Sequence, residues 1–436
     1  LALNSTYYWR VDEVNGPNTV KGDVWSFTTQ SDKASKPSPA SGALGVTINP
    51  TLSWSAGYGA VSHDVYFGTV SPGTFRGNQP GTTYTPAGPL ANAIPYYWRI
   101  DEVGPSGTIT GDVWNFTTAG FATMRKGPYL IYPGNNTQMT VLWQTDVTVG
   151  SSIAWGTDTS YSTGSASTTE YGTDHQHKYN ITSLTPGTKY YYRVTVTGNP
   201  PVTGSFRTAP AADATNVKFF MYGDTRNGIG NHNSIAGQWI STYTADPDYQ
   251  TMALLAGDWV SADGEAEWTA QWYTYSYTNI VNATASMPIM GAIGNHEGSG
   301  GTCFEKYHPF PYAAAPADYY SFDYGPVHVT VVDQYTSYTS GSAQYTWLVN
   351  DLSTSTKKWK IIVLHAPGWC AGGSHGNDGT VQSTIQPLCV TYGVQIVLAG
   401  HNHFYSRAVN NGVHHITSGS GGAPFYAVAA GWPYVV

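Results

Sequence analysis

The feature that most constrains the fold is a motif that occurs three times in the first half of the chain. Each copy has a Leu, five further residues, two tyrosines, an aromatic residue, an Arg and a β-branched residue, and the copies begin at Leu1, Leu90 and Leu184. A second short apolar segment introduced by Gly follows each copy. Alternating aromatic and polar residues between turn residues are typical of antiparallel strands. The repeat therefore predicts one β-hairpin unit used three times in β-sandwich domains.

The spacing from Leu to Tyr resembles the tyrosine corner of fibronectin type III-like domains. Further strand candidates, such as HDVYFGT and QMTVLWQT, precede the second and third copies but not the first. We therefore expect residues 1–30 to be the C-terminal hairpin of an incomplete domain, completed in a longer natural protein or by another chain. A Pro- and Ser-rich linker begins at Gln30. Sandwich domains are predicted for residues 31–119 and 120–211.

Composition excludes several classes of partner. Charged residues make up 11% of the chain and the net charge is −8, without any cluster of Lys and Arg, which argues against a nucleic-acid surface. No apolar run reaches the length of about 18 residues that crosses a bilayer, so no membrane span is expected. Three cysteines lack metal-type spacing; Cys370 and Cys389 could be bridged in an oxidising compartment, or each cysteine could be a buried free thiol.

The pattern changes after about residue 211, where short apolar runs alternate with helical stretches. Helices are expected over 234–244, 265–284 and 343–352, and residues 212–436 are predicted to form a layered α/β domain. Every apolar run ends at a polar side chain of the metal-binding type; these are Asp224, Asp258, Asn295, His365 and His401. Carboxylate, amide and imidazole groups at one sheet edge suit two adjacent divalent or trivalent ions.

The order and position of these strand ends resemble the calcineurin-like metallophosphoesterases and, among them, the purple acid phosphatases. The segments that carry the resemblance are GD at 223, GD at 257, GNHE at 294, VLHAP at 363 and GHNH at 400. It covers about residues 215–430, and the sandwich from about residue 121 resembles the N-terminal domain of that family. The implied fold is an α/β sandwich of two mixed sheets flanked by helices, behind all-β sandwiches of the fibronectin type III or immunoglobulin-like kind.

The resemblance also implies a binuclear metal centre of Fe, Zn or Mn. In it, Asp258 bridges both ions, Asp224 and His403 hold one, and Asn295, His365 and His401 hold the other. His296 and His375 are then candidates for the acid that protonates the leaving group, Glu297 would orient His296, and Arg226 would clamp the phosphate. Structural roles are the alternative for each: a residue that merely follows a ligand, a loop histidine, or an arginine paired with an acid.

Two departures concern the first metal. The superfamily has Asp-x-His at its first motif, where this chain has Arg226, and purple acid phosphatases carry a Tyr where this chain has Ser261. One ligand is therefore missing, and the ligand could be His232, Asp263 or water. Helix capping is the alternative role for His232 and Asp263.

The resulting hypothesis is a secreted, extracellular or cell-surface phosphatase that hydrolyses small phosphate monoesters with a two-metal-activated hydroxide. Phosphodiester hydrolysis by the same fold is one alternative. The other is a surface or filament protein with an idle or accessory phosphoesterase domain, which self-associates or has its first hairpin completed by a neighbour.

Overall fold

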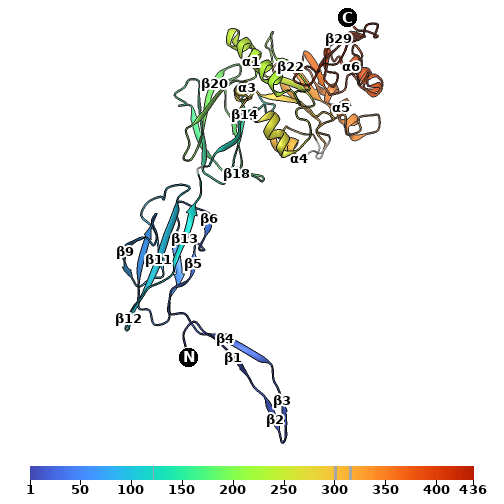
Figure 1. Ribbon diagram of the computed structural model, residues 1–436. Coiled ribbons are helices and arrows are strands. Elements are labelled where there is room, and N and C mark those ends of the chain that lie inside the picture. Colours follow the sequence, from blue (N-terminus) through green and yellow to red (C-terminus); the bar gives the residue numbers. More distant parts are fainter. Residues whose placement is uncertain (121, 299–301, 314–316) are drawn as a thin grey trace. The chain divides into compact units, whose positions relative to one another are not determined.

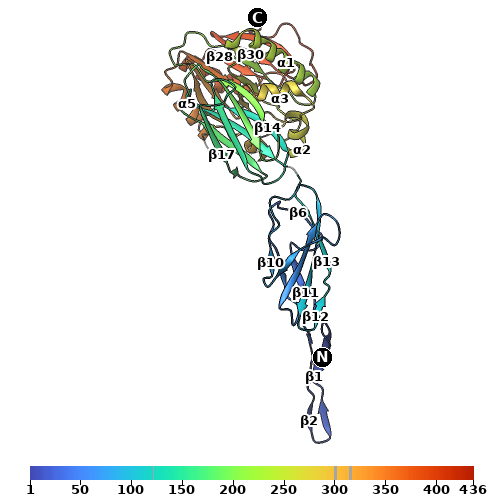
Figure 2. The same cartoon turned by 90° about the vertical axis from the view of Figure 1, so that its left-hand side faces the viewer.

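The computed structural model describes residues 1–120, 122–298, 302–313 and 317–436. The chain forms two compact units, Leu1–Phe121 and Ala122–Val436 (Figures 1 and 2). The first unit contains the two regions predicted as residues 1–30 and 31–119, and the second contains the predicted sandwich and α/β domains. Within the described residues, no helix is long and apolar enough to cross a membrane.

The first unit begins with a long hairpin and continues as a β-sandwich. In the hairpin, β1 pairs with β4 and β2 pairs with β3, and in the sandwich the strand orders are β10-β7-β5 and β6-β13-β11-β8-β9, with β12 on β11. The strands are β1 Thr6–Arg10, β2 Glu13–Asn15, β3 Asn18–Val20, β4 Val24–Thr28, β5 Ser35–Ser38, β6 Ala43–Val46, β7 Leu52–Ser55, β8 Ser62–Gly68, β9 Thr74–Gln79, β10 Thr83–Tyr84, β11 Pro95–Gly104, β12 Gly107–Ile109 and β13 Val113–Thr118.

The predicted tyrosine corner is present in all three copies of the repeat. In each, the backbone N–H five residues upstream donates to the tyrosine hydroxyl: Ala2 to Tyr7, Ala91 to Tyr96 and Thr185 to Tyr190. The hydrogen bond fixes the chain where it enters the strand that carries this tyrosine. The three segments are thus structurally equivalent as well as similar in sequence.

The first copy differs from the second in what covers its inner face. Trp98 and Trp114 are 0% and 8% exposed inside the sandwich, whereas their counterparts Trp9 and Trp25 are 49% and 47% exposed. In both copies the two tryptophans face each other across paired strands. Among the described residues, the hairpin has no second sheet packed against this face.

The second unit opens with another sandwich made of two four-stranded sheets, β14-β15-β19-β18 and β17-β16-β20-β21. Trp143, Tyr192 and Phe206 lie in its core, each at most 1% exposed. Its strands are β14 Met124–Ile131, β15 Met139–Thr145, β16 Ser151–Gly156, β17 Gly164–Thr168, β18 Glu170–Tyr171, β19 Gln176–Ile181, β20 Lys189–Val196 and β21 Val202–Arg207.

The rest of the second unit is an α/β domain with a parallel three-stranded sheet, β22-β23-β24, and a six-stranded sheet, β25-β26-β27-β28-β30-β29. In the larger sheet β26, β27, β28 and β30 are parallel, and the edge strands β25 and β29 are antiparallel. The strands are β22 Phe220–Tyr222, β23 Ala253–Ala256, β24 Ile289–Ala292, β25 Tyr320–Tyr324, β26 Val327–Val331, β27 Trp359–Val363, β28 Ile396–Ala399, β29 Tyr405–Asn410 and β30 Val413–Ser418.

Two of the three helices expected in this domain are found and the third is divided, and the helices at 302–307 and 386–392 were not expected. Expected helices over 234–244 and 343–352 are found as α1 and α5, but the stretch 265–284 is divided by a π-helical turn and a short irregular segment. Trp268 and Trp272, both buried, sit in that turn and join the aromatic core. The helices are α1 Ile229–Ala245, η1 Pro247–Tyr249, α2 Glu265–Glu267, η2 Trp268–Trp272, α3 Thr278–Thr284, α4 Thr302–Tyr307, α5 Ala343–Thr354, η3 Val381–Ile385 and α6 Gln386–Tyr392. Helices α1 and α3 lie side by side (Figures 1 and 2).

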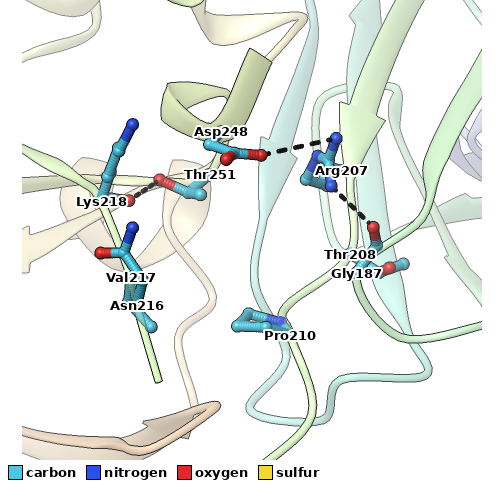
Figure 3. A pocket seen from close by; sticks show the side chains of 9 residues that line it. All are labelled: Gly187, Arg207, Thr208, Pro210, Asn216, Val217, Lys218, Asp248 and Thr251. Atoms are coloured by element: carbon cyan, nitrogen blue, oxygen red, sulfur yellow. Dashed lines mark hydrogen bonds and ion pairs between the residues drawn. The ribbon is translucent and has the colours of Figure 1, made fainter. Parts of the chain in front are cut away.

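Tyrosine hydroxyls and ion pairs fix the second sandwich to the α/β domain. Tyr129 donates to Tyr307 O, Tyr132 to Asp323 O and Tyr192 to Ala285 O. A pocket of about 190 Å³ lies along this junction, where Arg207 donates to Gly187 O and lies 4.0 Å from Asp248 (Figure 3). All three cysteines are free, so the possible bridge between Cys370 and Cys389 is not formed.

Candidate metal centre

The predicted ligands all follow the carboxyl ends of parallel strands. Asp224, Asp258 and Asn295 come after β22, β23 and β24, and His365 and His401 come after β27 and β28. His403 lies two residues beyond His401. Because the carboxyl ends of parallel strands share one edge, side chains from distant parts of the sequence are brought together there. The polar residues that follow the strands of the smaller sheet therefore lie close to those that follow the strands of the larger sheet.

The backbone at three of these positions is strained. Asp224, Asp258 and His401 have φ values of 60°, 55° and 65°, in the left-handed region that non-glycine residues seldom adopt. Such strain clusters at functional sites, where the surrounding structure enforces it.

Steric crowding explains why glycines precede the ligand residues. A Cβ on Gly294 would lie 2.1 Å from Asp258 Oδ1, and one on Gly257 would lie 2.4 Å from His365 Nδ1. The Gly-Asp and Gly-Asn pairs of the sequence therefore reflect loops packed too closely for any side chain.

Three donor atoms lie around His365 Nε2, and we call the four atoms the four-donor set: Asp258 Oδ1, Asn295 Oδ1, His365 Nε2 and His401 Nδ1. His365 Nε2 lies 3.1 Å from Asn295 Oδ1, 3.1 Å from His401 Nδ1 and 3.3 Å from Asp258 Oδ1. His365 Nδ1 donates its proton to Ala256 O at 2.7 Å, so Nε2 is the ring nitrogen that faces the other three donors.

The surroundings of His401 fix its protonation state. Burial, together with the neighbouring His365 and His375, lowers the pKa of His401 to about 3, so the ring is neutral at neutral pH. Asp258 and His365 are buried, His401 is half-buried and Asn295 is exposed. Carboxylate, amide and imidazole donors together are the ligand types that Fe, Zn and Mn accept. The arrangement fits a metal ion.

A second group, the three-donor set, consists of Asp224, Asp258 and His403, which offer ligand atoms within 4.8 Å of one another. His403 Nδ1 donates to Pro424 O at 2.8 Å, which places Nε2 3.4 Å from Asp224 Oδ1. Neither of these two facing atoms has a hydrogen-bond partner, although both are buried. Burial raises the pKa of Asp224. Asp258 belongs to both sets and so joins them.

Glu297 has a different position from the one expected. Its carboxylate does not contact His296; it accepts from the backbone N–H groups of Gly294 (2.8 Å), Asp258 (3.2 Å) and Val260 (3.0 Å). Burial, with the charge of Asp258, raises the pKa of Glu297 to about 8. Glu297 thus ties together the two loops that carry Asp258 and Asn295.

His296 is instead oriented by the backbone. Its Nδ1 donates to Ser261 O at 2.7 Å, which places Nε2 3.8 Å from Asp258 Oδ2. The ring is partly exposed, so it can reach a molecule bound beside Asp258. This position suits transfer of a proton at the site.

Arg226 and His375 also lie at the site. Arg226 Nε donates to Asp258 Oδ2 at 2.9 Å. The His375 ring lies 4.1 Å from that of His401, and its Nε2 is 3.3 Å from the hydroxyl of Tyr426. Tyr426 also stacks on His403 at 4.0 Å. Sequence reasoning missed Tyr426, because the C-terminal segment around it has no strand or helix periodicity.

His232 does not join either donor set. It is 1% exposed in α1, its Nε2 contacts the Tyr222 hydroxyl at 3.2 Å, and its ring stacks on Trp272. Burial lowers its pKa to about 3. His232 is therefore a core residue, and the expectation that it supplies the missing ligand is wrong in this structure.

The other positions considered for that ligand are engaged elsewhere. Ser261 Oγ accepts from Gln271 at 2.7 Å. Asp263 accepts from Trp268 Nε1 at 2.8 Å and from Cys303 N at 3.0 Å. Within the described part of the chain, the three-donor set gains no fourth protein ligand.

Comparison with known proteins assigns both parts of the second unit. Residues 217–405 match the calcineurin-like phosphoesterase family, and residues 126–209 match the purple acid phosphatase N-terminal domain. Both ranges lie within the predicted domains 212–436 and 120–211.

Individual relatives agree with these matches. Probable purple acid phosphatase 20 of Arabidopsis thaliana is 29% identical over 62% of this chain and 66% of its own length. Purple acid phosphatase 22 of the same plant is 32% identical over 56% of this chain and 58% of its length. The chain thus spans about three fifths of the length of these curated relatives.

The fold agrees with solved structures. Purple acid phosphatase PPD1 from yellow lupin (Lupinus luteus) superposes with a TM-score of 0.57 at 17% identity, over 89% of this chain and 86% of that one. PhoD gives a TM-score of 0.51 at 14% identity, over 66% of this chain and 75% of that one. The chain therefore carries a purple acid phosphatase N-terminal domain followed by a calcineurin-like phosphoesterase domain.

Proposed function

We propose that this chain hydrolyses phosphate monoesters at a site that holds two metal ions. The observation that carries the proposal is the convergence of side chains from five separate strand ends, which brings oxygen and nitrogen donors close together and leaves Asp224 Oδ1 and His403 Nε2 buried without a hydrogen-bond partner. The donors of the four-donor set are Asp258, Asn295, His365 and His401, and those of the three-donor set are Asp224, Asp258 and His403. Mixed oxygen and nitrogen donors suit Fe, Zn or Mn.

When bound, two such ions supply positive charge for the phosphoryl oxygens and make a water molecule more acidic. Hydrolysis forms a bond between water oxygen and phosphorus and breaks the ester bond, so the departing oxygen must gain a proton. His296 Nε2 lies 3.8 Å from Asp258 Oδ2, where an imidazole nitrogen can hold and deliver that proton. His375, on the far side of His401, is the other candidate.

Arg226 supplies the phosphate contact in this proposal. Its guanidinium is already at Asp258, 13% exposed, and its planar fork matches two phosphoryl oxygens. The preference for monoesters and the export of the protein rest on the family likeness and on the sandwich modules ahead of the phosphoesterase domain.

The proposal is tested by hydrolysis of p-nitrophenyl phosphate and its bis-ester by the intact chain, after removal of metal and addition of Mn²⁺, Zn²⁺ or Fe. We expect metal-dependent release of p-nitrophenol, faster from the monoester. Faster release from the bis-ester would mean that the preferred substrates are diesters and not monoesters. If neither ester released p-nitrophenol with any of the metals, the enzymatic function would be refuted.

A further inference from the structure

The two donor sets are unequal in a way that bears on metal binding. The four-donor set has four protein ligands, whereas the three-donor set has three and shares one of them, Asp258. The position three residues after Asp258 is Ser261, whose hydroxyl accepts from Gln271. An ion in the three-donor set therefore has fewer protein contacts.

The two donor sets differ in a second way, because Arg226 already donates a hydrogen bond to Asp258, the carboxylate that they share. Asp258 Oδ1 accepts from His296 N at 3.1 Å and faces His365, so it belongs to the four-donor set. That leaves Oδ2 for the other ion, and Oδ2 already accepts from Arg226 Nε at 2.9 Å. Asp258 is 1% exposed and Arg226 13% exposed, so water screens this ion pair only weakly.

We propose that Arg226 and an ion in the three-donor set compete for Asp258 Oδ2. This inference rests on the metal site of the proposed function. The chain then binds one ion tightly through the four-donor set and a second ion weakly, since an ion must displace or crowd a guanidinium on the same carboxylate. The positive charges of the ion and of the Arg226 guanidinium repel each other when both contact one carboxylate.

A phosphate group relieves the competition. Its oxygens can accept from the guanidinium in place of Asp258 Oδ2, and its negative charge offsets the two neighbouring positive charges. Binding of phosphate and of the second ion should therefore favour each other, and this coupling is reciprocal. Arg226 would act as a positioning residue that links completion of the metal pair to the arrival of substrate.

The experiment measures ion affinity rather than turnover. The intact chain, freed of metal by chelation and dialysis, is titrated with Mn²⁺ by calorimetry, and bound manganese is counted after equilibrium dialysis. Wild type should bind one ion tightly and a second at least about tenfold more weakly. Arg226→Gln should tighten the second ion about tenfold, the weight of one charge-assisted hydrogen bond. Arg207→Gln, in the same unit and away from both sets, should change neither affinity.

A second measurement works even if the variant fails to fold. Inorganic phosphate should tighten the second ion at least about fivefold in wild type, and this gain should shrink in Arg226→Gln. Two equal affinities in wild type, or no effect of phosphate or of Arg226→Gln on the second ion, would overturn the competition and leave the proposed function standing. Binding of no ion at all would overturn both.

Discussion

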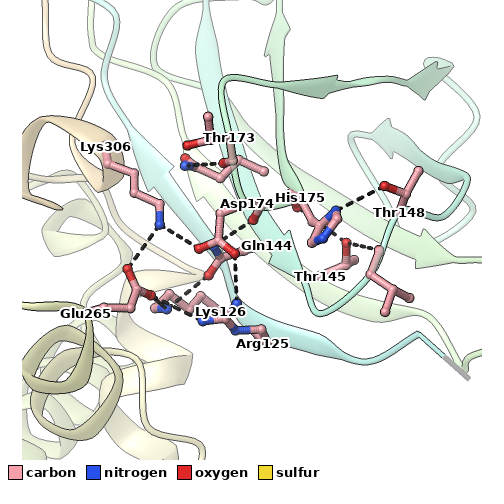
Figure 4. Close-up of polar contacts among 12 residues, drawn as sticks. Arg125, Lys126, Gln144, Thr145, Thr148, Thr173, Asp174, His175, Glu265 and Lys306 are labelled. Carbon is pink, nitrogen blue, oxygen red and sulfur yellow. Dashed lines mark hydrogen bonds and ion pairs between the residues drawn. The ribbon is translucent and has the colours of Figure 1, made fainter. Parts of the chain in front are cut away.

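Glu265 offers the sharpest test of how the second sandwich is joined to the phosphoesterase domain. Its carboxylate accepts from Lys126 Nζ at 2.5 Å and from Lys306 Nζ at 3.0 Å, and Arg125 lies 3.3 Å away (Figure 4). The Tyr307 hydroxyl donates to the same carboxylate. Lys126 is fully buried, and its ammonium also donates to Gln144 Oε1 at 3.0 Å and lies 4.8 Å from the centre of the Tyr307 ring. Glu265→Gln removes the negative charge but keeps the shape of the side chain, so the loss of stability that it causes is electrostatic.

The size of the effect follows from the pKa of Glu265. Burial opposes the charged form, but Lys126, Tyr307 and Lys306 outweigh it and lower the pKa from 4.5 to about 2. For a fully buried group this would correspond to about 3 kcal/mol. The side chain is 38% exposed, and solvent screening reduces the expected loss to about 2 kcal/mol for Glu265→Gln. The stabilisation is present above pH 4.5 and is lost as pH falls through about 2.

Urea unfolding followed by tryptophan fluorescence measures this loss. Burial lowers the pKa of Lys126, and Glu265 opposes that lowering. Without the Glu265 charge, the buried ammonium of Lys126 destabilises the folded variant until it loses its proton. The difference in the free energy of unfolding between variant and wild type should therefore be smaller at pH 9.5 than at pH 7. Asp248→Asn, at an exposed pair with Arg207, should cost under about 0.5 kcal/mol. A loss for Glu265→Gln below about 0.5 kcal/mol, or one that does not change with pH, would refute the reasoning.

Three further predictions concern the site and the fold. Asp258→Asn should lower kcat for p-nitrophenyl phosphate by about 10³-fold or more, because both donor sets lose a charged ligand; an unchanged kcat in a folded variant would contradict the site. Gly294→Ala should reduce bound manganese and activity together, since its Cβ would lie 2.1 Å from Asp258 Oδ1, whereas Gly230→Ala, with open space around it, should leave both unchanged. Burial disfavours charged His328, but Asp323 and Asp351 outweigh it and raise its pKa to about 9, so its stabilisation is complete below about pH 6.5 and lost as pH rises through 9. Between pH 6 and pH 9.5 the urea midpoint of unfolding should therefore fall further for wild type than for His328→Gln. Equal falls in the two proteins would show that these ion pairs of His328 do not cause the pH dependence.

The sequence allowed the strand ends to be predicted because Gly-Asp, Gly-Asn and Gly-His follow short apolar runs. Each such pair combines a glycine required by close packing with a residue that tolerates left-handed backbone. Asp224, Asp258 and Asn295 could thus be found without knowledge of the fold. The equivalence of the three hairpins was likewise visible, since it depends on residues close together in the sequence.

Other features depend on contacts that no local pattern encodes. The role of Glu297 follows from three backbone N–H groups that face it only when two loops meet. His232 was expected near the metal because it opens a helix after Asp224, but stacking on Trp272 turns it into the core. The interruption of 265–284 follows from burial of Trp268 and Trp272, which outweighs the helical tendency of the segment.

The left-handed backbone at Asp224, Asp258 and His401 restricts how the metal preference of this chain could be redesigned. Asn, Asp and His are the non-glycine residues most often found in that conformation, and these are also donors of the kind present here. Exchange for Cys, to favour softer metals, would change the coordination chemistry and add conformational strain at once. Attempts to alter metal selectivity should therefore begin at Asn295, His365 or His403, which have no positive φ.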